Sequence, residues 1–170
     1  MADDPRSEQS PVAFVDLDGV LADVRHRLHH VTSRPKDWDA FFAVAIRDEL
    51  HPEGRAVVER LRQDHEVVYL TSRPERCRDD TLAWLARHGL DGPELIMRSP
   101  RDRRPAAVVK VEVIARRFAD RDVAVVVDDD DRVVAAMRAA GHPVLHAEWE
   151  QRLAEEAAAL DAAQEVEGRT

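Results

Sequence analysis

Short apolar runs alternate with amphipathic segments along most of this chain. Five runs have the length of a strand and lie next to polar or turn-forming residues, at 12–15, 66–70, 94–97, 122–127 and 143–146. Apolar residues recur at helical spacing over 36–46, 52–63, 79–88, 105–118, 132–140 and 149–164. Strands that alternate with helices predict an α/β fold with a doubly wound, mainly parallel five-stranded sheet.

The same pattern predicts one domain with two flanking segments. Residues 1–10 are polar and lack periodicity, so we expect a tail there. Residues 11–147 are expected to form the α/β domain, with a small cap or flap insertion at about 22–52. Residues 148–170 are expected to form a C-terminal helix and tail. Leu153, Ala157 and Leu160 share the helix face that we expect to pack on the domain's own core.

The expected insertion contains a basic loop followed by an aromatic helix. Arg27 lies in the loop at 22–35, and arginine holds phosphate oxygens in a bidentate fork, so Arg27 is a candidate substrate contact; a solvated loop is the alternative. Trp38, Phe41 and Phe42 follow helical spacing in the helix at 36–46, which begins at Asp37 or Asp39. Core packing and a stacking platform for a nucleobase both fit these aromatic residues.

Composition narrows the class of protein. The 170 residues are 44% hydrophobic and 35% charged, and no apolar stretch approaches 18 residues, so we expect a soluble globular protein without a membrane partner. The absence of a secretory signal and the single cysteine, Cys77, favour a cytoplasmic location. The net charge of −9 disfavours a broad surface for duplex nucleic acid but allows a small basic pocket for one phosphate. The pattern predicts no oligomeric state.

Acidic residues follow the first and fourth expected strands. Asp16 and Asp18 end the first strand, and Gly19 lets the chain turn closely past a ligand. The fourth strand ends in four aspartates at 128–131, of which the third or fourth is expected to cap the next helix. Ligands bind beyond the carboxyl ends of such strands, and Mg²⁺ prefers carboxylate oxygens. The candidate metal ligands are Asp16, Asp18, Asp128 and Asp129.

The second strong strand ends in Thr71, Ser72 and Arg73. Two hydroxyls and a guanidinium at a strand end can hold phosphate oxygens through hydrogen bonds and charge. A capped loop before the next helix is the alternative. Together with the acids, these side chains form a set that can bind Mg²⁺ and a phosphate.

Four motifs, in this order along the chain, resemble the haloacid dehalogenase (HAD) superfamily of phosphotransferases. They are Asp16-Leu-Asp18-Gly19-Val-Leu, Tyr69-Leu-Thr71, Lys110 and Val127-Asp128-Asp129. The resemblance covers about residues 12–146 and implies a HAD-like, Rossmann-like sheet with a small cap after the first strand.

The resemblance also implies a role for each motif residue. It identifies Asp16 as the nucleophile that forms an aspartyl phosphate, and Asp18 as the general acid and base. It implies that Thr71 and Lys110 hold the phosphoryl group. It assigns Asp128 to the metal, with support from Asp129 and from the backbone carbonyl of Asp18.

Within the superfamily, the sequence resembles the 3′-phosphatase domain of bacteriophage-type polynucleotide kinase-phosphatases. The residues that carry this resemblance are Arg27, Thr71-Ser-Arg73, Val108-Val-Lys110-x-Glu112, and Asp128-Asp129 followed by Val133-Val134, Arg138 and Gly141. It implies Arg27 and Arg73 as substrate contacts, and nucleic acid 3′-phosphate ends in end repair as the substrate. Ala106 and Asp130 depart from that family's pattern, which has an acid and an arginine at these positions.

Two other functions remain open at this point. A nucleotide or small-metabolite HAD phosphatase would use the same motifs, and a noncatalytic HAD-fold binding module would keep the fold alone. The modest insertion favours an open site, which suits a phosphorylated chain end or a protein. The chain contains no Gly-x-x-x-x-Gly-Lys-Ser/Thr motif, so we expect no kinase activity from it.

Overall fold

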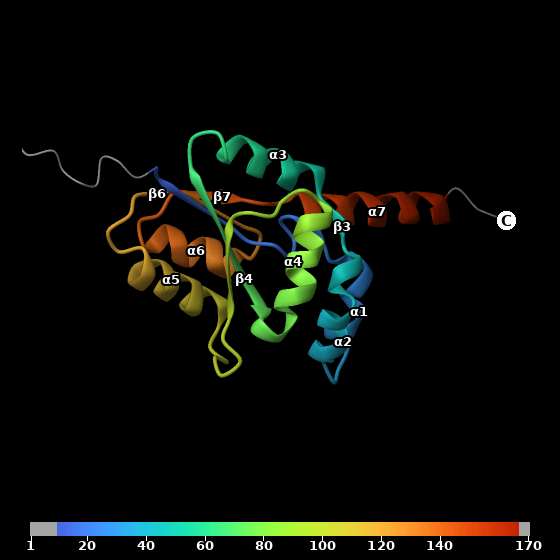
Figure 1. Ribbon diagram of the computed structural model, residues 1–170. Helices are drawn as coiled ribbons and strands as arrows, with labels where there is room; N and C mark the ends of the chain where they lie inside the picture. Colours follow the sequence, from blue (N-terminus) through green and yellow to red (C-terminus); the bar gives the residue numbers. More distant parts are fainter. Residues whose placement is uncertain (1–9, 167–170) are drawn as a thin grey trace, which may run out of the picture.

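A parallel sheet of five strands forms the centre of the molecule. The computed structural model describes residues 10–166, with side chains described up to residue 159. The strand order is β5-β4-β1-β6-β7, and every neighbouring pair is parallel (Figure 1). The strands are β1 (Val12–Val15), β4 (Glu66–Pro74), β5 (Glu94–Arg98), β6 (Val123–Asp128) and β7 (Val144–His146). The predicted α/β fold with a five-stranded parallel sheet is confirmed.

Helices cover both faces of this sheet. Val12 and Phe14 of β1 belong to a core shared with α5 (Ala106–Arg117) and α6 (Asp131–Ala139). Val15 belongs to the opposite core, shared with α3 (Pro52–Leu61) and α4 (Arg78–Arg87). Alternate residues of a strand point to opposite faces, so a strand covered on both faces has only apolar residues. All four residues of β1 are fully buried.

The order of the strands fixes where a ligand can enter. The chain leaves β1 through α3 on one face, and it leaves the neighbouring strand β6 through α6 on the other face. Two adjacent strands whose following helices lie on opposite faces leave a crevice beyond their carboxyl ends. That crevice lies beside the acidic residues that follow β1 and β6.

A small cap lies between β1 and α3. Two short antiparallel strands, β2 (Ala22–Asp23) and β3 (Glu49–Leu50), close it at its base. Between them lie η2 (Arg25–Arg27), α1 (His29–Thr32), α2 (Trp38–Ala43) and η3 (Ala45–Arg47). We call residues 22–50 the cap.

The cap differs from the sequence prediction in its details. The single helix expected at 36–46 is two pieces, because the backbone leaves helical geometry at Val44. Asp37 is the helix cap, as expected, and its carboxylate accepts a hydrogen bond from the Ala40 backbone N–H at 2.8 Å. The expected loop at 22–35 contains the short helices η2 and α1, which have too few residues to show a periodic pattern.

Two other elements also differ from expectation. Strand β4 extends to Pro74 instead of ending at Leu70, and its pairing with β5 shifts register between these residues. The helix η4 (Glu75–Cys77) then leads into α4. No helix within residues 10–166 is long and apolar enough to span a membrane.

The C-terminal helix α7 (Trp149–Val166) extends away from the sheet (Figure 1). Its first turn is anchored, because the Trp149 indole N–H donates to the Val20 carbonyl at 2.9 Å. Leu153 is half-buried and Ala157 is exposed, so the expected packing of this face on the core is wrong for Ala157. The side chain of Leu160 lies outside the described part of the chain, as do residues 1–9 of the expected tail and residues 167–170.

Gly54 allows α3 to pack closely on the chain that follows β1. A Cβ at this position would lie 2.1 Å from the Val20 carbonyl oxygen. A helical Gly→Ala change normally stabilises a protein by about 0.5–1 kcal/mol, but here the added methyl has no space. We predict that Gly54→Ala lowers the free energy of unfolding by about 1–3 kcal/mol, measured by urea denaturation. An unchanged or higher stability would contradict this packing.

Candidate active site

Three aspartates from two neighbouring strands meet at the carboxyl edge of the sheet. The register pairs Val15 with Val127, and the Asp16 backbone N–H donates to the Val127 carbonyl at 3.0 Å. This register places Asp16 beside Asp128. One carboxylate oxygen from each of Asp16, Asp128 and Asp129 lies within 4.8 Å of the others. Asp16 and Asp128 are buried, so their charges are poorly screened by solvent.

Lys110 of α5 supplies the positive charge beside these acids. Its ammonium nitrogen lies 2.7 Å from Asp16 Oδ2 and 2.6 Å from Asp128 Oδ2. Burial alone would lower the pKa of Lys110, but the two carboxylates outweigh it and raise the pKa above its ordinary value. The lysine therefore remains protonated and bridges the acids.

One positive charge does not offset three carboxylates. Burial raises the pKa of Asp16 to about 7; the charge of Lys110 acts against this shift, and the charge of Asp128 adds to it. Burial, together with the charges of Asp16 and Asp128, raises the pKa of Asp129 to about 8. A divalent cation among these carboxylates would lower both pKa values, because it favours the charged forms.

Asp18 lies in a separate network of two arginines. Its Oδ1 accepts hydrogen bonds from Arg27 Nη2 at 2.8 Å and from Arg73 Nη2 at 2.6 Å. Burial would raise the pKa of Asp18, but the charges of Arg73 and Arg27 outweigh burial and lower it. The carboxylate form of Asp18 is therefore favoured, and this is the form that can accept a proton.

Asp48 completes this network, and sequence reasoning missed it. Its fully buried carboxylate accepts hydrogen bonds from Arg27 Nε and Nη2 at 2.8 and 2.7 Å, and from Arg73 Nη2 at 2.9 Å. His26 Nε2 lies 2.8 Å from the same carboxylate. Asp48 belongs to no recognisable sequence motif, so the sequence alone does not indicate this role.

The other predicted residues lie at the same edge of the sheet. Thr71 is buried in β4, three residues before the strand ends at Pro74, and its hydroxyl accepts a hydrogen bond from the Arg73 backbone N–H at 3.2 Å. The Ser72 side chain lines the cleft described below. Gly19 has a φ of +75°, and a Cβ there would lie 2.1 Å from Asp129 Oδ2. Glycine at this position therefore makes room for the Asp129 carboxylate.

A cleft of about 920 Å³ opens from this edge toward the cap. Asp16, Asp18, Lys110 and Asp129 line its inner part. Arg27 and Arg73 are not among the lining residues, because they lie buried behind Asp18. Their predicted contact with substrate therefore stays a prediction.

A family profile described as "Polynucleotide kinase PNKP phosphatase domain" matches residues 10–150, which include every residue of this site. The chain belongs to this family of phosphatase domains. Membership of this PNKP-type family confirms the predicted HAD superfamily and the prediction that the protein is a phosphatase. No protein with a curated description matches the chain.

Solved structures resemble this PNKP-type domain. One chain from a structure of the Pnkp1/Rnl/Hen1 RNA repair complex is 25% identical with a TM-score of 0.66, and one from a structure of the Pnkp1/Rnl/Hen1 complex is 23% identical with a TM-score of 0.67. The matches cover 85% and 82% of this domain but only 44% and 46% of those chains. This domain therefore spans less than half of their length. A haloacid dehalogenase-like hydrolase from Streptococcus pneumoniae, SP0104, shares the fold at 15% identity and a TM-score of 0.56, with 81% and 84% of the chains covered.

We predict that Asp48 is essential for the stability of this domain. Asp48→Asn removes the charge that two buried guanidinium groups share, and breaking a buried pair costs about 3–5 kcal/mol. Urea denaturation measures this loss. Asp39→Asn is the matched control, because the Asp39 side chain is 89% exposed in its pair with Arg76 and should change stability by less than about 1 kcal/mol. Equal effects of the two variants would show that burial of the Asp48 network is unimportant.

We also predict a pH-dependent effect at Asp129. Its pKa is raised from 3.8 to about 8 in the folded protein, so the folded state binds more protons than the unfolded chain, and stability is lost as the pH rises through this range. Asp129→Asn removes this loss. In EDTA, the variant should therefore exceed the parent protein in stability by more at pH 8 than at pH 5, as thermal denaturation at both values can measure. A stability difference that does not change with pH would refute this prediction.

Proposed function

We propose that this domain is a Mg²⁺-dependent phosphomonoesterase that removes 3′-phosphates from polynucleotide ends during nucleic acid end repair. The main support is the position of Asp16, whose carboxylate contacts Lys110 and adjoins two further acids at the inner end of the cleft. Family membership supports phosphate chemistry, and similarity to chains from an RNA repair complex supports a polynucleotide substrate.

The residues present fit one divalent cation. Three carboxylates and one ammonium group carry a formal charge of −3 + 1 = −2, which one Mg²⁺ would neutralise. The donors are all oxygens, as Mg²⁺ prefers. Asp16, Asp128 and Asp129 would hold the cation, with the backbone carbonyl of Asp18 as a further proposed ligand. When bound, Mg²⁺ would reduce the repulsion between Asp16 and a phosphate dianion and stabilise charge in the transition state.

Asp16 would act as the nucleophile. Its carboxylate oxygen attacks phosphorus and forms an aspartyl phosphate, while the bond from phosphorus to the leaving 3′-oxygen breaks. The negative charge of the arriving phosphate favours the protonated form of Asp18, which donates this proton to that oxygen, so the product leaves as an alcohol. Lys110 and Thr71 would hold the oxygens of the phosphoryl group during the transfer.

Asp18 would then act as the base. It takes a proton from a water molecule, which attacks the aspartyl phosphate, releases inorganic phosphate and restores Asp16. Arg27 and Arg73 both bind Asp18 Oδ1, and no hydrogen bond from a described residue reaches Oδ2. One oxygen is thus fixed by the arginines, and the other remains available for proton transfer.

Two further side chains would contact the substrate. Arg27 Nη1 has no hydrogen-bond partner among residues 10–159, but it is buried, so a substrate oxygen can reach it only if the side chains in front of it move. Such an unpaired buried donor is costly unless a ligand satisfies it. Ser72 lines the cleft beside the reacting groups. We propose both as substrate contacts, with Arg73 beside them.

We predict that Asp16→Asn abolishes phosphate release, by a factor on the order of 10⁴ or more, because the amide is a poor nucleophile. A 3′-phosphorylated oligonucleotide is the substrate, and released phosphate is measured. EDTA should abolish activity of the parent protein, and Mg²⁺ should restore it. Asp64→Asn is the matched control, because the Asp64 side chain is 65% exposed on the surface.

Full activity of Asp16→Asn would contradict the mechanism. Turnover of free mononucleotides or metabolites that equals or exceeds turnover of the oligonucleotide would instead favour a small-molecule phosphatase with the same chemistry.

A further inference from the structure

The outer part of the cleft has an aromatic wall that the reaction does not use. Trp38 of α2 lines it, and the Trp38 side chain is 49% exposed. The Trp38 and Phe42 rings stack, with centroids 6.0 Å apart and an interplanar angle of 24°. Core packing, one of the two roles considered for Trp38 from the sequence, is therefore wrong, because an indole in the core would be buried.

The aromatic wall is continuous with the catalytic residues. Phe41 is buried beneath Trp38, with ring centroids 5.6 Å apart. The Arg27 guanidinium carbon lies 4.1 Å above the Phe41 ring. Since Arg27 also binds Asp18, a ligand on Trp38 would lie on the cap side of the same cleft as the reacting phosphate.

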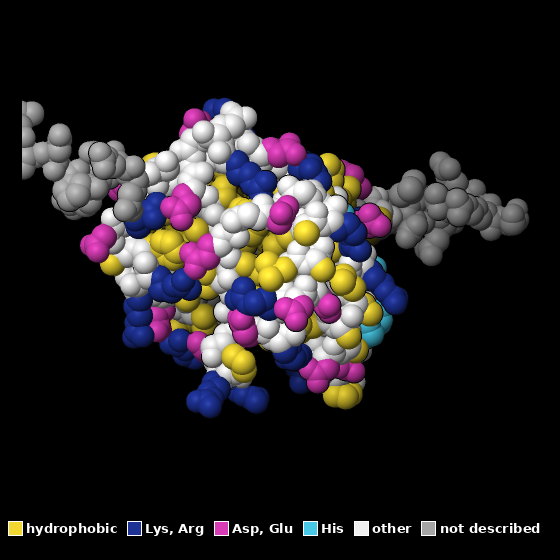
Figure 2. Space-filling view, in the orientation of Figure 1, with side chains coloured by type: hydrophobic (Ala, Val, Ile, Leu, Met, Phe, Trp, Pro, Cys, Tyr) yellow, Lys and Arg dark blue, Asp and Glu magenta, His cyan; other side chains and the backbone are white. Residues whose placement is uncertain are grey.

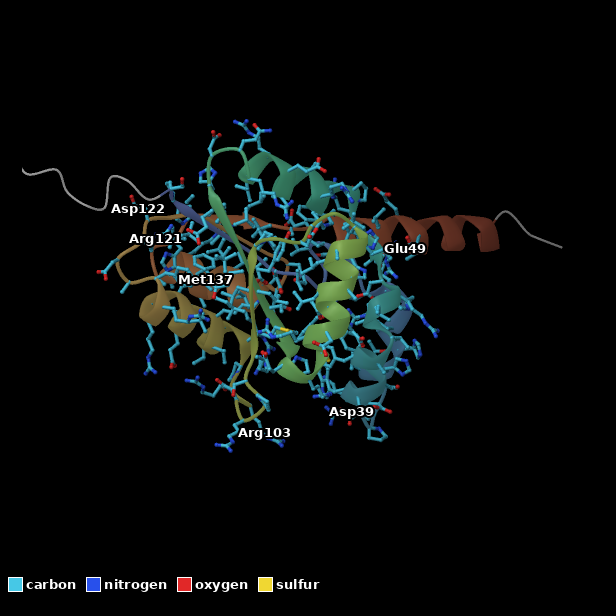
Figure 3. All side chains as sticks on the ribbon, in the orientation of Figure 1. Asp39, Glu49, Arg103, Arg121, Asp122 and Met137 are labelled. Carbon is cyan, nitrogen blue, oxygen red and sulfur yellow. The ribbon has the colours of Figure 1, made fainter. Side chains whose placement is uncertain are left out.

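Arginines line the opposite side of the cleft. Arg103 lies at the tip of the loop between β5 and α5, across from Asp39 of α2 (Figure 3). Figure 2 shows basic side chains gathered at this tip, along the lower edge of the molecule. Arg132 of α6 lines the cleft as well. Within residues 10–159, neither Arg103 nor Arg132 forms an ion pair, whereas Arg104 is paired with Asp102 and Glu112.

We propose that this outer cleft binds the single-stranded segment that precedes the 3′-terminal nucleotide. An unpaired base stacks on Trp38, and backbone phosphates pair with Arg103 and Arg132. Aromatic platforms beside a basic groove are how proteins bind single strands without reading sequence. The proposal rests on the proposed function, because the reacting 3′-phosphate fixes which end of the strand enters.

Charge and size favour this ligand over a smaller one. The chain has a net charge of −9, so unpaired arginines in the cleft form a local site for a polyanion on an otherwise acidic protein. The cleft of about 920 Å³ is near the upper limit of small-molecule pockets, roughly 300–1,000 Å³, and far exceeds the space that one phosphoryl group needs. An acidic peptide would satisfy the arginines but would supply no base for the exposed indole.

Kinetics on substrates of different length test the proposal. We expect Trp38→Ala to raise KM for a 3′-phosphorylated tetranucleotide about 5- to 150-fold, at least five times more than KM for p-nitrophenyl phosphate. Trp38→Phe should recover most of the loss. Arg103→Gln should raise KM for the tetranucleotide and weaken its salt dependence, whereas Arg60→Gln, whose side chain is 74% exposed on α3, should not. Equal effects of Trp38→Ala on both substrates, or an unchanged KM for the tetranucleotide, would overturn the proposal.

Binding without turnover separates this proposal from the proposed function. Trp84 and Trp149 are buried, so Trp38 is the indole that a ligand in the cleft can reach. In the Asp16→Asn protein, a 3′-phosphorylated RNA or DNA tetranucleotide should quench tryptophan fluorescence, and Trp38→Phe should remove the quenching. If no oligonucleotide is dephosphorylated but quenching occurs, the subsite stands and the proposed reaction fails. Absence of quenching, or quenching by a phosphopeptide alone, would overturn the subsite.

Discussion

The pairing of β1 with β6 determines the chemistry of this protein. Their parallel register places two buried carboxylates side by side at the edge of the sheet. Like charges at such a distance are unfavourable unless a positive charge lies among them. Lys110 supplies one such charge from α5, and with Asp129 nearby the cluster has three carboxylates against one ammonium group. The acids at this edge of the sheet could therefore hold a metal ion.

A second charged network connects the cap to the sheet. Arg27 and Asp48 belong to the cap. Asp18 follows the sheet strand β1, and Arg73 lies near the end of the sheet strand β4. Each arginine binds both acids, so the orientation of Asp18 depends on the folded cap. Bidentate guanidinium groups suit this role, because their donors lie in one plane at fixed angles. The cap thus contributes to the orientation of Asp18, the proposed general acid and base, as well as to the wall of the cleft.

Much of this arrangement could be predicted from the sequence. Buried parallel strands are short and wholly apolar, so β1 and β6 were predictable, and the acids that follow them had to share an edge. The cap was less predictable. Its α-helices have four and six residues, and its strands have two. Segments this short are not long enough to show a hydrophobic periodicity that would identify them. Asp48 was missed because its importance arises from burial and from partners at 21 and 25 residues' distance along the chain.

The shared ion pairs also constrain how the substrate gains access. Swinging the cap away from the sheet would separate Arg27 from Asp18 and Arg73 from Asp48, so these ion pairs oppose such a motion. Many enzymes with movable lids are limited by the rate of lid opening. Here ion pairs join the cap to the sheet, and the cleft is open in the structure. We therefore expect ligands to exchange through the cleft without a large motion of the cap.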